Sequence, residues 1–225
     1  MTTLRWRAPA AELLGTALLL WAIVGSGIAV THDGPLIAQL FPHAIAVGLA
    51  LAAIIVMLAP ISGAHLNPAV TLAAVLLGHL PRAQALGYVT AQIVGGAAGV
   101  VLAHVTFGLP AVTLAGNGRD GLPLLASELV VTLVLVLLIF LMVRAGRTSA
   151  TIAATVGAFI AAALLFSAST AFANPAVTLA RMLSDTFTGI APGSAPGFLA
   201  AQLIGALAAV LLVKWFTAPD HSDER

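Results

Sequence analysis

A seven-residue segment that could interact with a passing solute occurs twice in this chain. Residues 67–73 read Asn-Pro-Ala-Val-Thr-Leu-Ala, and the same seven letters recur at 174–180. Asn followed by Pro favours the start of a helix, because Asn is among the best N-cap residues and Pro is favoured at the first helical position. The amide oxygen of each Asn would then accept a backbone N–H of the first turn, which leaves the amide NH2 group as a fixed pair of hydrogen-bond donors.

Two such caps that face each other inside a membrane would offer donors with no matching acceptor, and a solute that carries lone pairs would supply one. Each helix N-terminus would add about half a positive charge. In a narrow passage of low dielectric this field opposes cations, including the hydronium ion. The pattern therefore predicts that neutral hydroxylic molecules pass and that protons and metal cations do not. One Asn-Pro-Ala alone would indicate only a capped helix, but two copies in equivalent places need a common explanation.

The composition places these segments in a membrane. Of the 225 residues, 60% are hydrophobic and only 8% are charged, whereas about 25% of the residues of a soluble domain are charged. The formal net charge of +1 leaves no basic face for nucleic acid. There is no cysteine, and therefore no disulfide, thiol nucleophile or thiolate metal site. Since the sequence also lacks a nucleophile–base pair and a set of metal ligands, we expect no enzyme and no metal site.

Six apolar stretches are long enough to cross a bilayer, which takes about 20 residues. They are residues 10–30, 37–59, 83–105, 123–143, 151–169 and 196–216. The two Asn-Pro segments lie instead in apolar stretches of about half that length, at 66–77 and 173–183. Short apolar helices of this kind re-enter the membrane from one side, and they are tolerated only where they are buried in protein or line water.

The surroundings of the two Asn-Pro segments repeat as well. Glu12 in the first span matches Glu128 in the fourth, and the Ala-Gln of the third span, at 91–92, recurs at 201–202 in the sixth. Each half, about 8–105 and about 123–217, thus has three spans and one half-helix. An odd number of spans inverts the second half, so the half-helices enter from opposite faces. We expect an all-α membrane protein with six transmembrane helices plus two re-entrant half-helices in an inverted 3+3 repeat, as one channel domain over 1–225.

The distribution of basic residues predicts the orientation. With six spans both termini share a side, and that side would hold seven of the nine Lys and Arg residues, leaving Arg119 and Arg181 on the other. The positive-inside rule then places the N- and C-termini in the cytoplasm. The excess of Arg over Lys suggests a bacterial chain, and hence the cell (inner) membrane.

The sequence Ser-Gly-Ala-His-Leu-Asn-Pro-Ala-Val-Thr at 62–71, with Asn-Pro-Ala at 174–176, resembles the aquaporin, or major intrinsic protein, family. The resemblance extends from residue 10 to about 216 and implies a pore within six tilted helices, a homotetramer with one pore per subunit, and no cofactor. It implies that the pore motif consists of Asn67, Pro68, Ala69, Asn174, Pro175 and Ala176. It also implies that acceptor carbonyls line the pore at Gly63, Ala64, His65, Thr170, Ala171 and Phe172.

The chain departs from that family at the narrowest point of the pore. The second motif of the family usually continues as Asn-Pro-Ala-Arg, but Val177 stands in the place of the Arg. By the spacing of the family, the selectivity filter would consist of Val47, Ala162, Ala171 and Val177. In water-selective members an aromatic residue, a His and the Arg stand there. Small apolar side chains would widen the constriction and remove its donors, unless Phe166 and Phe172 fill the space.

Three charged residues lie within the apolar regions, and two roles can be considered for each. Glu12 and Glu128 could form a proton relay, but we favour structural bracing, in which each carboxylate accepts unpaired N–H groups of one re-entrant loop. The resemblance implies the same role. Arg181 lies four residues after Val177 and so shares its helix face. It could therefore reach the outer mouth of the pore, or else pair with Asp185 or with a loop carbonyl and tie down the end of the half-helix.

The six histidines do not cluster. His65 belongs to the first pore loop and is expected to act through its carbonyl. The others are expected at the membrane interfaces and not as ligands: His32, His43, His79, His104 and His221.

These observations favour a passive channel of the aquaglyceroporin-like kind. It would carry water together with glycerol, urea-like solutes or neutral metalloid hydroxides, and it would exclude protons and ions. The alternative within the class is an ordinary water-selective aquaporin with a rebuilt filter. An ion-coupled transporter would need titratable groups where the half-helices meet, whereas the sequence places two Asn and no carboxylate there. A purely structural membrane protein gives no reason for two half-helices that carry donors.

Overall fold

The computed structural model describes residues 6–31 and 34–218, and this part of the chain is all-helical. Six of its helices are long and apolar enough to cross a membrane, and they confirm the predicted spans. They are α1 (Arg7–Val30), α2 (Leu36–Ser62), α4 (Arg82–Thr106), α5 (Leu122–Arg144), α6 (Ser149–Phe166) and α8 (Ala195–Phe216). Helix α6 ends at Phe166, before the predicted residue 169, because the backbone turns extended at Ser167 to begin a loop.

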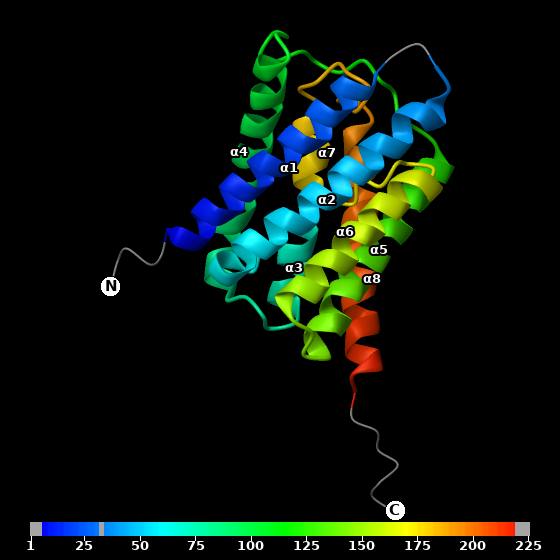
Figure 1. Ribbon diagram of the computed structural model, residues 1–225. Coiled ribbons are helices and arrows are strands. Elements are labelled where there is room, and N and C mark those ends of the chain that lie inside the picture. The colour runs from blue at the N-terminus through cyan, green and yellow to red at the C-terminus, as the bar shows by residue number, and fades with distance from the viewer. Residues whose placement is uncertain (1–5, 32–33, 219–225) are drawn as a thin grey trace, which may run out of the picture.

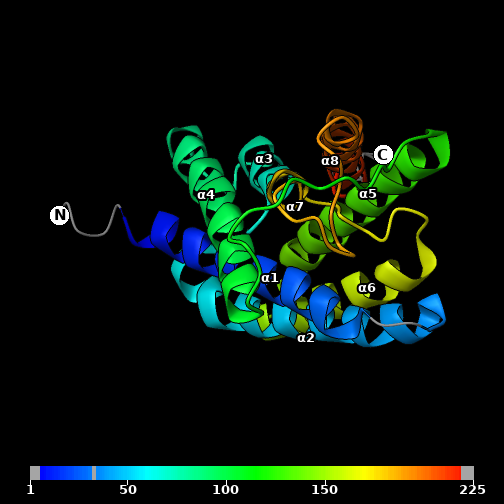
Figure 2. The same cartoon turned by 90° about the horizontal axis from the view of Figure 1, so that it is seen from above.

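The two remaining helices are the predicted half-helices, α3 (Pro68–Leu76) and α7 (Pro175–Arg181). In Figure 1 α3 lies in the lower part of the molecule and α7 in the upper part. Figure 2 shows that both lie among the long helices rather than beside them. Both begin at an Asn-Pro pair, and their N-terminal ends face each other. The fold is thus the predicted inverted arrangement of two three-span halves, each with one half-helix.

The two halves pack through the same kind of helix–helix contact. Helix α1 packs on α4, and α5 packs on α8. At the first contact Gly95 lies against Leu13, where an added Cβ would be 2.2 Å from the Leu13 carbonyl oxygen. At the second, a Cβ on Gly205 would be 2.3 Å from the carbonyl oxygen of Leu129. Glycine at these positions lets the helix backbones touch, which is how helices commonly associate in lipid.

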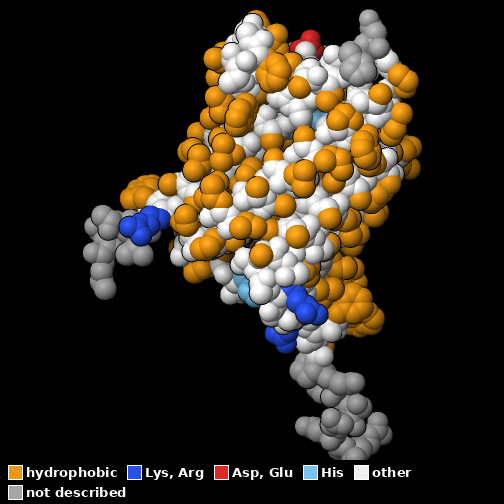
Figure 3. Space-filling view, viewed as in Figure 1, with side chains coloured by type: hydrophobic (Ala, Val, Ile, Leu, Met, Phe, Trp, Pro, Cys, Tyr) orange, Lys and Arg blue, Asp and Glu red, His pale blue; other side chains and the backbone are white. Residues whose placement is uncertain are grey.

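The outer surface divides into an apolar wall and two ends. Figure 3 shows hydrophobic side chains over most of the visible wall, with Lys and Arg towards the lower end and at the lower left. We call this the basic end, because five basic residues lie where long helices begin or finish there: Arg7, Arg82, Arg144, Arg147 and Lys214. The opposite end, the loop end, carries the connections 107–121 and 182–194.

Candidate functional site

The half-helices begin with the side-chain caps that the sequence predicts. The Asn67 amide oxygen accepts the N–H of Ala69 at 2.8 Å, and the Asn174 amide oxygen accepts the N–H of Ala176 at 2.9 Å. Pro68 and Pro175 occupy the first turns. The capping role of both Asn residues is therefore confirmed.

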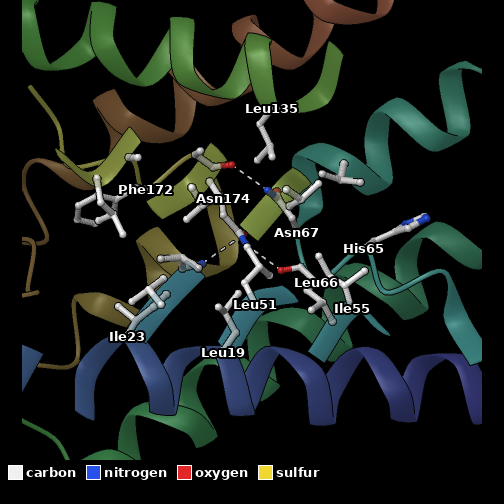
Figure 4. A pocket seen from close by; sticks show the side chains of 18 of the residues that line it. Leu19, Ile23, Leu51, Ile55, His65, Leu66, Asn67, Leu135, Phe172 and Asn174 are labelled. Atoms are coloured by element: carbon white, nitrogen blue, oxygen red, sulfur yellow. Dashed lines mark hydrogen bonds between the residues drawn. The ribbon is translucent and has the colours of Figure 1, made fainter. Parts of the chain in front are cut away.

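Each Asn also bonds to the opposite loop, which the sequence did not reveal. Asn67 Nδ2 donates to the carbonyl oxygen of Ala173 at 2.8 Å, and Asn174 Nδ2 donates to the carbonyl oxygen of Leu66 at 2.7 Å. Figure 4 shows these two reciprocal bonds. The expectation of amide groups with no matching acceptor was wrong, because a carbonyl of the other loop supplies one acceptor to each. One N–H of each amide has no partner in the described part of the chain.

The loops that lead into the half-helices are strained in matching ways. Within the described residues, the only non-glycine residues with positive φ are in these loops: Ala64, Leu66, Thr170, Ala171 and Ala173. The left-handed conformation costs about 1–3 kcal/mol per residue and persists only where the surroundings enforce it. Both loops therefore need fixed partners for their backbone.

Glu12 is one such partner. Its carboxylate is fully buried and accepts the N–H of His65 at 2.9 Å and the N–H of Leu66 at 2.6 Å. The side chains of Ser62 and Gln92 donate to the same carboxylate, at 2.6 and 2.8 Å. All four of these donors belong to the first half, and two of them belong to the strained loop.

Glu128 repeats this arrangement in the second half. Its fully buried carboxylate accepts the N–H groups of Phe172 and Ala173, both at 2.9 Å, and a side-chain N–H of Gln202 at 2.6 Å. Among the described residues, neither Glu12 nor Glu128 lines the three cavities that adjoin the pore loops. This is the geometry that the bracing interpretation requires.

A cavity runs past both caps. It is narrow, about 70 Å³, and its walls are mainly aliphatic side chains of α1, α2, α5 and α6. Asn67 and Asn174 lie on it, whereas Pro68, Ala69, Pro175 and Ala176 are buried in the half-helices behind it. Figure 4 shows Leu19, Leu51, Ile55 and Leu135 around the two amides.

The cavity adjoins a wider space at each end. Towards the basic end it shares Ile55, Ala64 and His65 with a cavity of about 220 Å³. Towards the loop end it shares His43 and Arg181 with a cavity of about 190 Å³. The predicted carbonyl positions lie along these three spaces: Gly63, Ala64, His65, Thr170, Ala171 and Phe172. Together the three spaces follow the axis of the helix bundle.

Three of the four predicted filter residues line the narrow cavity, namely Val47, Ala171 and Val177. Ala162 does not, and this prediction was wrong. It is exposed on the outer face of α6, while Ile160 and Leu164 of the same helix face the cavity. Ala162 was chosen by counting residues without a gap. Each position along a helix rotates the side chain by about 100°, so a small error in the count turns the wrong face of α6 inward.

Arg181 lies at the loop end of the cavity. Its side chain is 3% exposed, its Nε donates to the carbonyl oxygen of Thr188, and its Cζ lies 3.4 Å from the centroid of the Phe172 ring. Asp185 does not pair with it, and instead accepts the N–H of Gly116 at 2.9 Å. The alternative of an Arg181–Asp185 pair was therefore wrong, whereas the alternative of a bond to a loop carbonyl is confirmed by Thr188.

His43 also lines the cavity, which contradicts its expected place at the interface. It is buried, and its Nδ1 bonds to the hydroxyl of Ser26 at 2.8 Å. It precedes Val47 by four residues on α2, just as Arg181 follows Val177 by four residues on α7. The same four-residue spacing in the sequence could have predicted both side chains at the loop end.

Of the remaining aromatic and His side chains, some line a cavity and others pack elsewhere in the protein. Phe172 lines the cavity, but Phe166 is 67% exposed and fills nothing. His104 is not interfacial, because it is fully buried and joins Pro110 and Ser184 through its two ring nitrogens, each at 2.8 Å. His79 is exposed and stacks on Phe140 beside the wider cavity at the basic end. His32 and His221 lie outside the described residues.

Six spans, two half-helices that meet at their N-termini and a path along their junction define a membrane channel fold. The family model described as "Major intrinsic protein" matches residues 1–171 and 146–224. The chain belongs to this family, whose members are membrane channels and not enzymes.

Individual relatives agree with this assignment. The chain is 45% identical over 212 residues to aquaglyceroporin AqpS of Rhizobium meliloti (strain 1021), an alignment that covers 93% of this chain and 89% of the relative. It is 32% identical to aquaporin-2 of Bos taurus, over 95% of this chain and 79% of the relative. Among solved structures, the aquaglyceroporin from Plasmodium falciparum has the same fold, with a TM-score of 0.74 at 22% identity over 94% of this chain and 95% of that one.

Proposed function

We propose that this chain is a passive channel for water together with glycerol, urea-like amides or neutral metalloid hydroxides, and that it excludes protons and ions. One observation carries the proposal. The narrow cavity has an aliphatic wall interrupted by the amides of Asn67 and Asn174, and no carboxylate is among its lining residues. A neutral solute can accept the remaining N–H of each amide while its apolar part contacts the wall.

The proposal that several solutes pass depends on three side chains that lie near the half-helix junction, on the side of the loop end. Val47, Ala171 and Val177 offer no side-chain donor or acceptor and occupy little space. Without donors at this position, a solute need not have the size and geometry of water to pass. The name of the relative AqpS, an aquaglyceroporin at 45% identity, supports glycerol. The relative named aquaporin-2 is consistent with the alternative of an ordinary aquaporin.

Proton exclusion rests on the half-helix termini. Helices α3 and α7 direct their N-termini to one point, where the aligned peptide dipoles disfavour a cation. Water at that point would accept hydrogen bonds from the Asn amides. Its oxygen would then be held between two donors, which interrupts a hydrogen-bonded chain that could carry protons.

Two polar side chains of the path lie one helical turn from Val47 and Val177, towards the loop end. We assign Arg181 and His43 to an outer mouth above the apolar constriction, since both line the narrow cavity and the space beyond it. Guanidinium and imidazole groups there would orient a hydroxylated solute before it enters.

The cellular setting forms part of the proposal. The single channel domain over residues 1–225 would lie in the cell (inner) membrane. Its basic end and both termini would face the cytoplasm, because Arg7, Arg82, Arg144 and Arg147 lie at that end. The assembly would be a homotetramer with one path per subunit, in contact with the lipid bilayer.

Stopped-flow light scattering on proteoliposomes tests the solute range. Water, glycerol, urea and arsenite gradients are applied in parallel to vesicles with and without the protein. Protein-dependent permeation of water and of at least one larger neutral solute is expected. Permeation of water alone would favour the water-selective alternative, and no permeation of any solute would overturn the channel assignment.

A further inference from the structure

Two arginines at the loop end are fixed side by side by one stretch of backbone. Arg119 Nε donates to the carbonyl oxygen of Gly189 at 2.9 Å, and its Nη2 donates to that of Phe187 at 3.4 Å. Arg181 Nε donates to the carbonyl oxygen of Thr188, between the other two. Three consecutive carbonyls thus hold two guanidinium groups that come from distant parts of the chain.

Both guanidinium groups also contact the same aromatic ring. The Cζ atoms of Arg119 and Arg181 lie 5.0 and 3.4 Å from the centroid of Phe172. The ring and the carbonyls attract the cations, but neither carries a full negative charge. The two positive charges therefore remain close together without a counter-charge in the ring or the backbone.

No carboxylate in the described part of the chain forms an ion pair with either arginine, and the buried Glu128 carboxylate acts on both guanidinium charges only through space. Asp185 is bonded to the backbone of Gly116, and Glu128 is committed to the second pore loop. Burial lowers the pKa of the Arg119 guanidinium from its ordinary value, which is the effect of charge withdrawn from water without full compensation. The Nη atoms of Arg181 and Nη1 of Arg119 make no hydrogen bond within the described residues.

These free donors border a cavity of about 190 Å³ that is also lined by His43 and Thr170. The cavity can hold an anion of a few non-hydrogen atoms. A guanidinium group binds a carboxylate through two parallel N–H···O bonds, and such charge-assisted bonds are roughly twice as strong as neutral ones. Arg119 is only partly buried, so the site can be reached from outside.

We propose that Arg119 and Arg181 form a binding site for one small carboxylate-type oxyanion in this cavity, at the loop-end mouth of the path. His43 and Arg181 line both this cavity and the narrow one. An anion bound here therefore occupies the entrance and slows the entry of neutral solutes. The inference deepens the proposed function by adding a ligand at the mouth, but the binding itself does not depend on which solute permeates.

Equilibrium binding of radiolabelled formate to the purified full chain in detergent tests the site. We expect saturable binding of one formate per chain. Formamide, a neutral molecule of nearly the same shape, should not displace it. Arg119→Gln and Arg181→Gln should each weaken binding at least tenfold, and Arg147→Gln at the basic end should leave it unchanged. Absence of saturable binding, equal displacement by formamide, or full binding by both mouth variants would overturn the proposal.

Two further measurements keep the test decisive. If the Gln variants do not fold, Arg119→Lys and Arg181→Lys replace them. These variants keep the positive charge but cannot form the two parallel N–H···O bonds of a guanidinium group. They should therefore bind formate several-fold more weakly than the original chain. Glycerol uptake by proteoliposomes is then measured with and without external formate, and formate should slow it. Glycerol uptake without formate binding would refute only the anion site, while formate binding without any solute uptake would refute only the proposed channel function.

Discussion

Arg181 lies four residues beyond Val177 on α7, and both side chains line the same narrow cavity. His43 lies four residues before Val47 on α2, and it also lines this cavity. Besides the two Asn amides at the half-helix junction, the path thus has polar side chains one helical turn, ~5.4 Å, from the apolar positions Val47 and Val177. The path therefore has a polar mouth and an apolar constriction in succession.

Val177→Arg should restore a donor at the constriction and narrow it. Glycerol permeability should fall more than water permeability, because the guanidinium takes space that the larger solute needs. Stopped-flow measurements of both solutes on the same proteoliposomes give the ratio. Ala162→Val, on the exposed face of α6, is the matched control and should change neither rate. Equal losses would mean that the new side chain merely plugs the path, and no loss would mean that position 177 does not face the solute.

Arg181→Ala should open the mouth, raising the permeation of large neutral solutes and weakening discrimination against cations. Asp185→Ala should alter neither property, because this carboxylate bonds to Gly116 and not to Arg181. Solute uptake and cation leak are measured for both variants at equal amounts of folded protein. If Arg181→Ala lowers only the yield of folded protein, Arg181 serves solely as a strut for the 187–189 segment.

Glu128→Gln should destabilise the second pore loop. Its carboxylate accepts N–H groups of Phe172, Ala173 and Gln202, and an amide would turn a donor towards one of them. The loss of one such bond with a buried donor left unpaired costs about 1–3 kcal/mol. Thermal unfolding in detergent should show a lower midpoint. The protein that remains folded should leak no protons. A large change in proton flux at unchanged stability would restore the relay interpretation.

Asn174→Asp should weaken the barrier to cations. The carboxylate can still cap α7, but it cannot donate to the Leu66 carbonyl at 2.7 Å as the amide does, and it introduces a potential negative charge where the half-helices meet. Asn67→Asp should act alike through its contact with Ala173. Cation conductance is compared in planar bilayers. If conductance in both inserted variants stays at the original level, the donors at the junction do not control ion exclusion.

Gly95→Ala should prevent the close packing of α4 on α1, because the new Cβ would lie 2.2 Å from the Leu13 carbonyl oxygen. Gly87→Ala on the same helix is the control, since its Cβ would only touch Pro9 at 3.6 Å. The first variant should lose folded protein in size-exclusion chromatography, whereas the second should match the original or exceed it, as Ala favours a helix over Gly by about 1 kcal/mol. Equal yields would show that α1 can shift to admit the methyl group.

The long helices and the two Asn caps could be predicted from the sequence because they depend on local rules. An apolar run of sufficient length and an Asn-Pro pair determine a span and a capped start without reference to the rest of the chain. The duplication then predicted how the half-helices face each other. Val177 could be located because it directly follows the second Asn-Pro-Ala motif.

The features that the sequence did not reveal depend on contacts between distant segments. The bonds from each Asn to the opposite loop require two positive φ angles, at Leu66 and Ala173, that no local preference predicts for these residue types. Ala162 was misplaced because no nearby motif fixes which face of α6 points inward. Arg119 reaches the mouth only because the long connection after α4 folds over the 187–189 segment.

The most direct test of the central claim compares glycerol and proton flux in one preparation. Proteoliposomes that contain the original chain and an entrapped pH-sensitive dye are exposed first to a glycerol gradient and then to a pH gradient. We expect protein-dependent glycerol uptake and no protein-dependent change in internal pH. A proton leak that rises with the amount of protein, or the absence of glycerol uptake by folded protein, would contradict it.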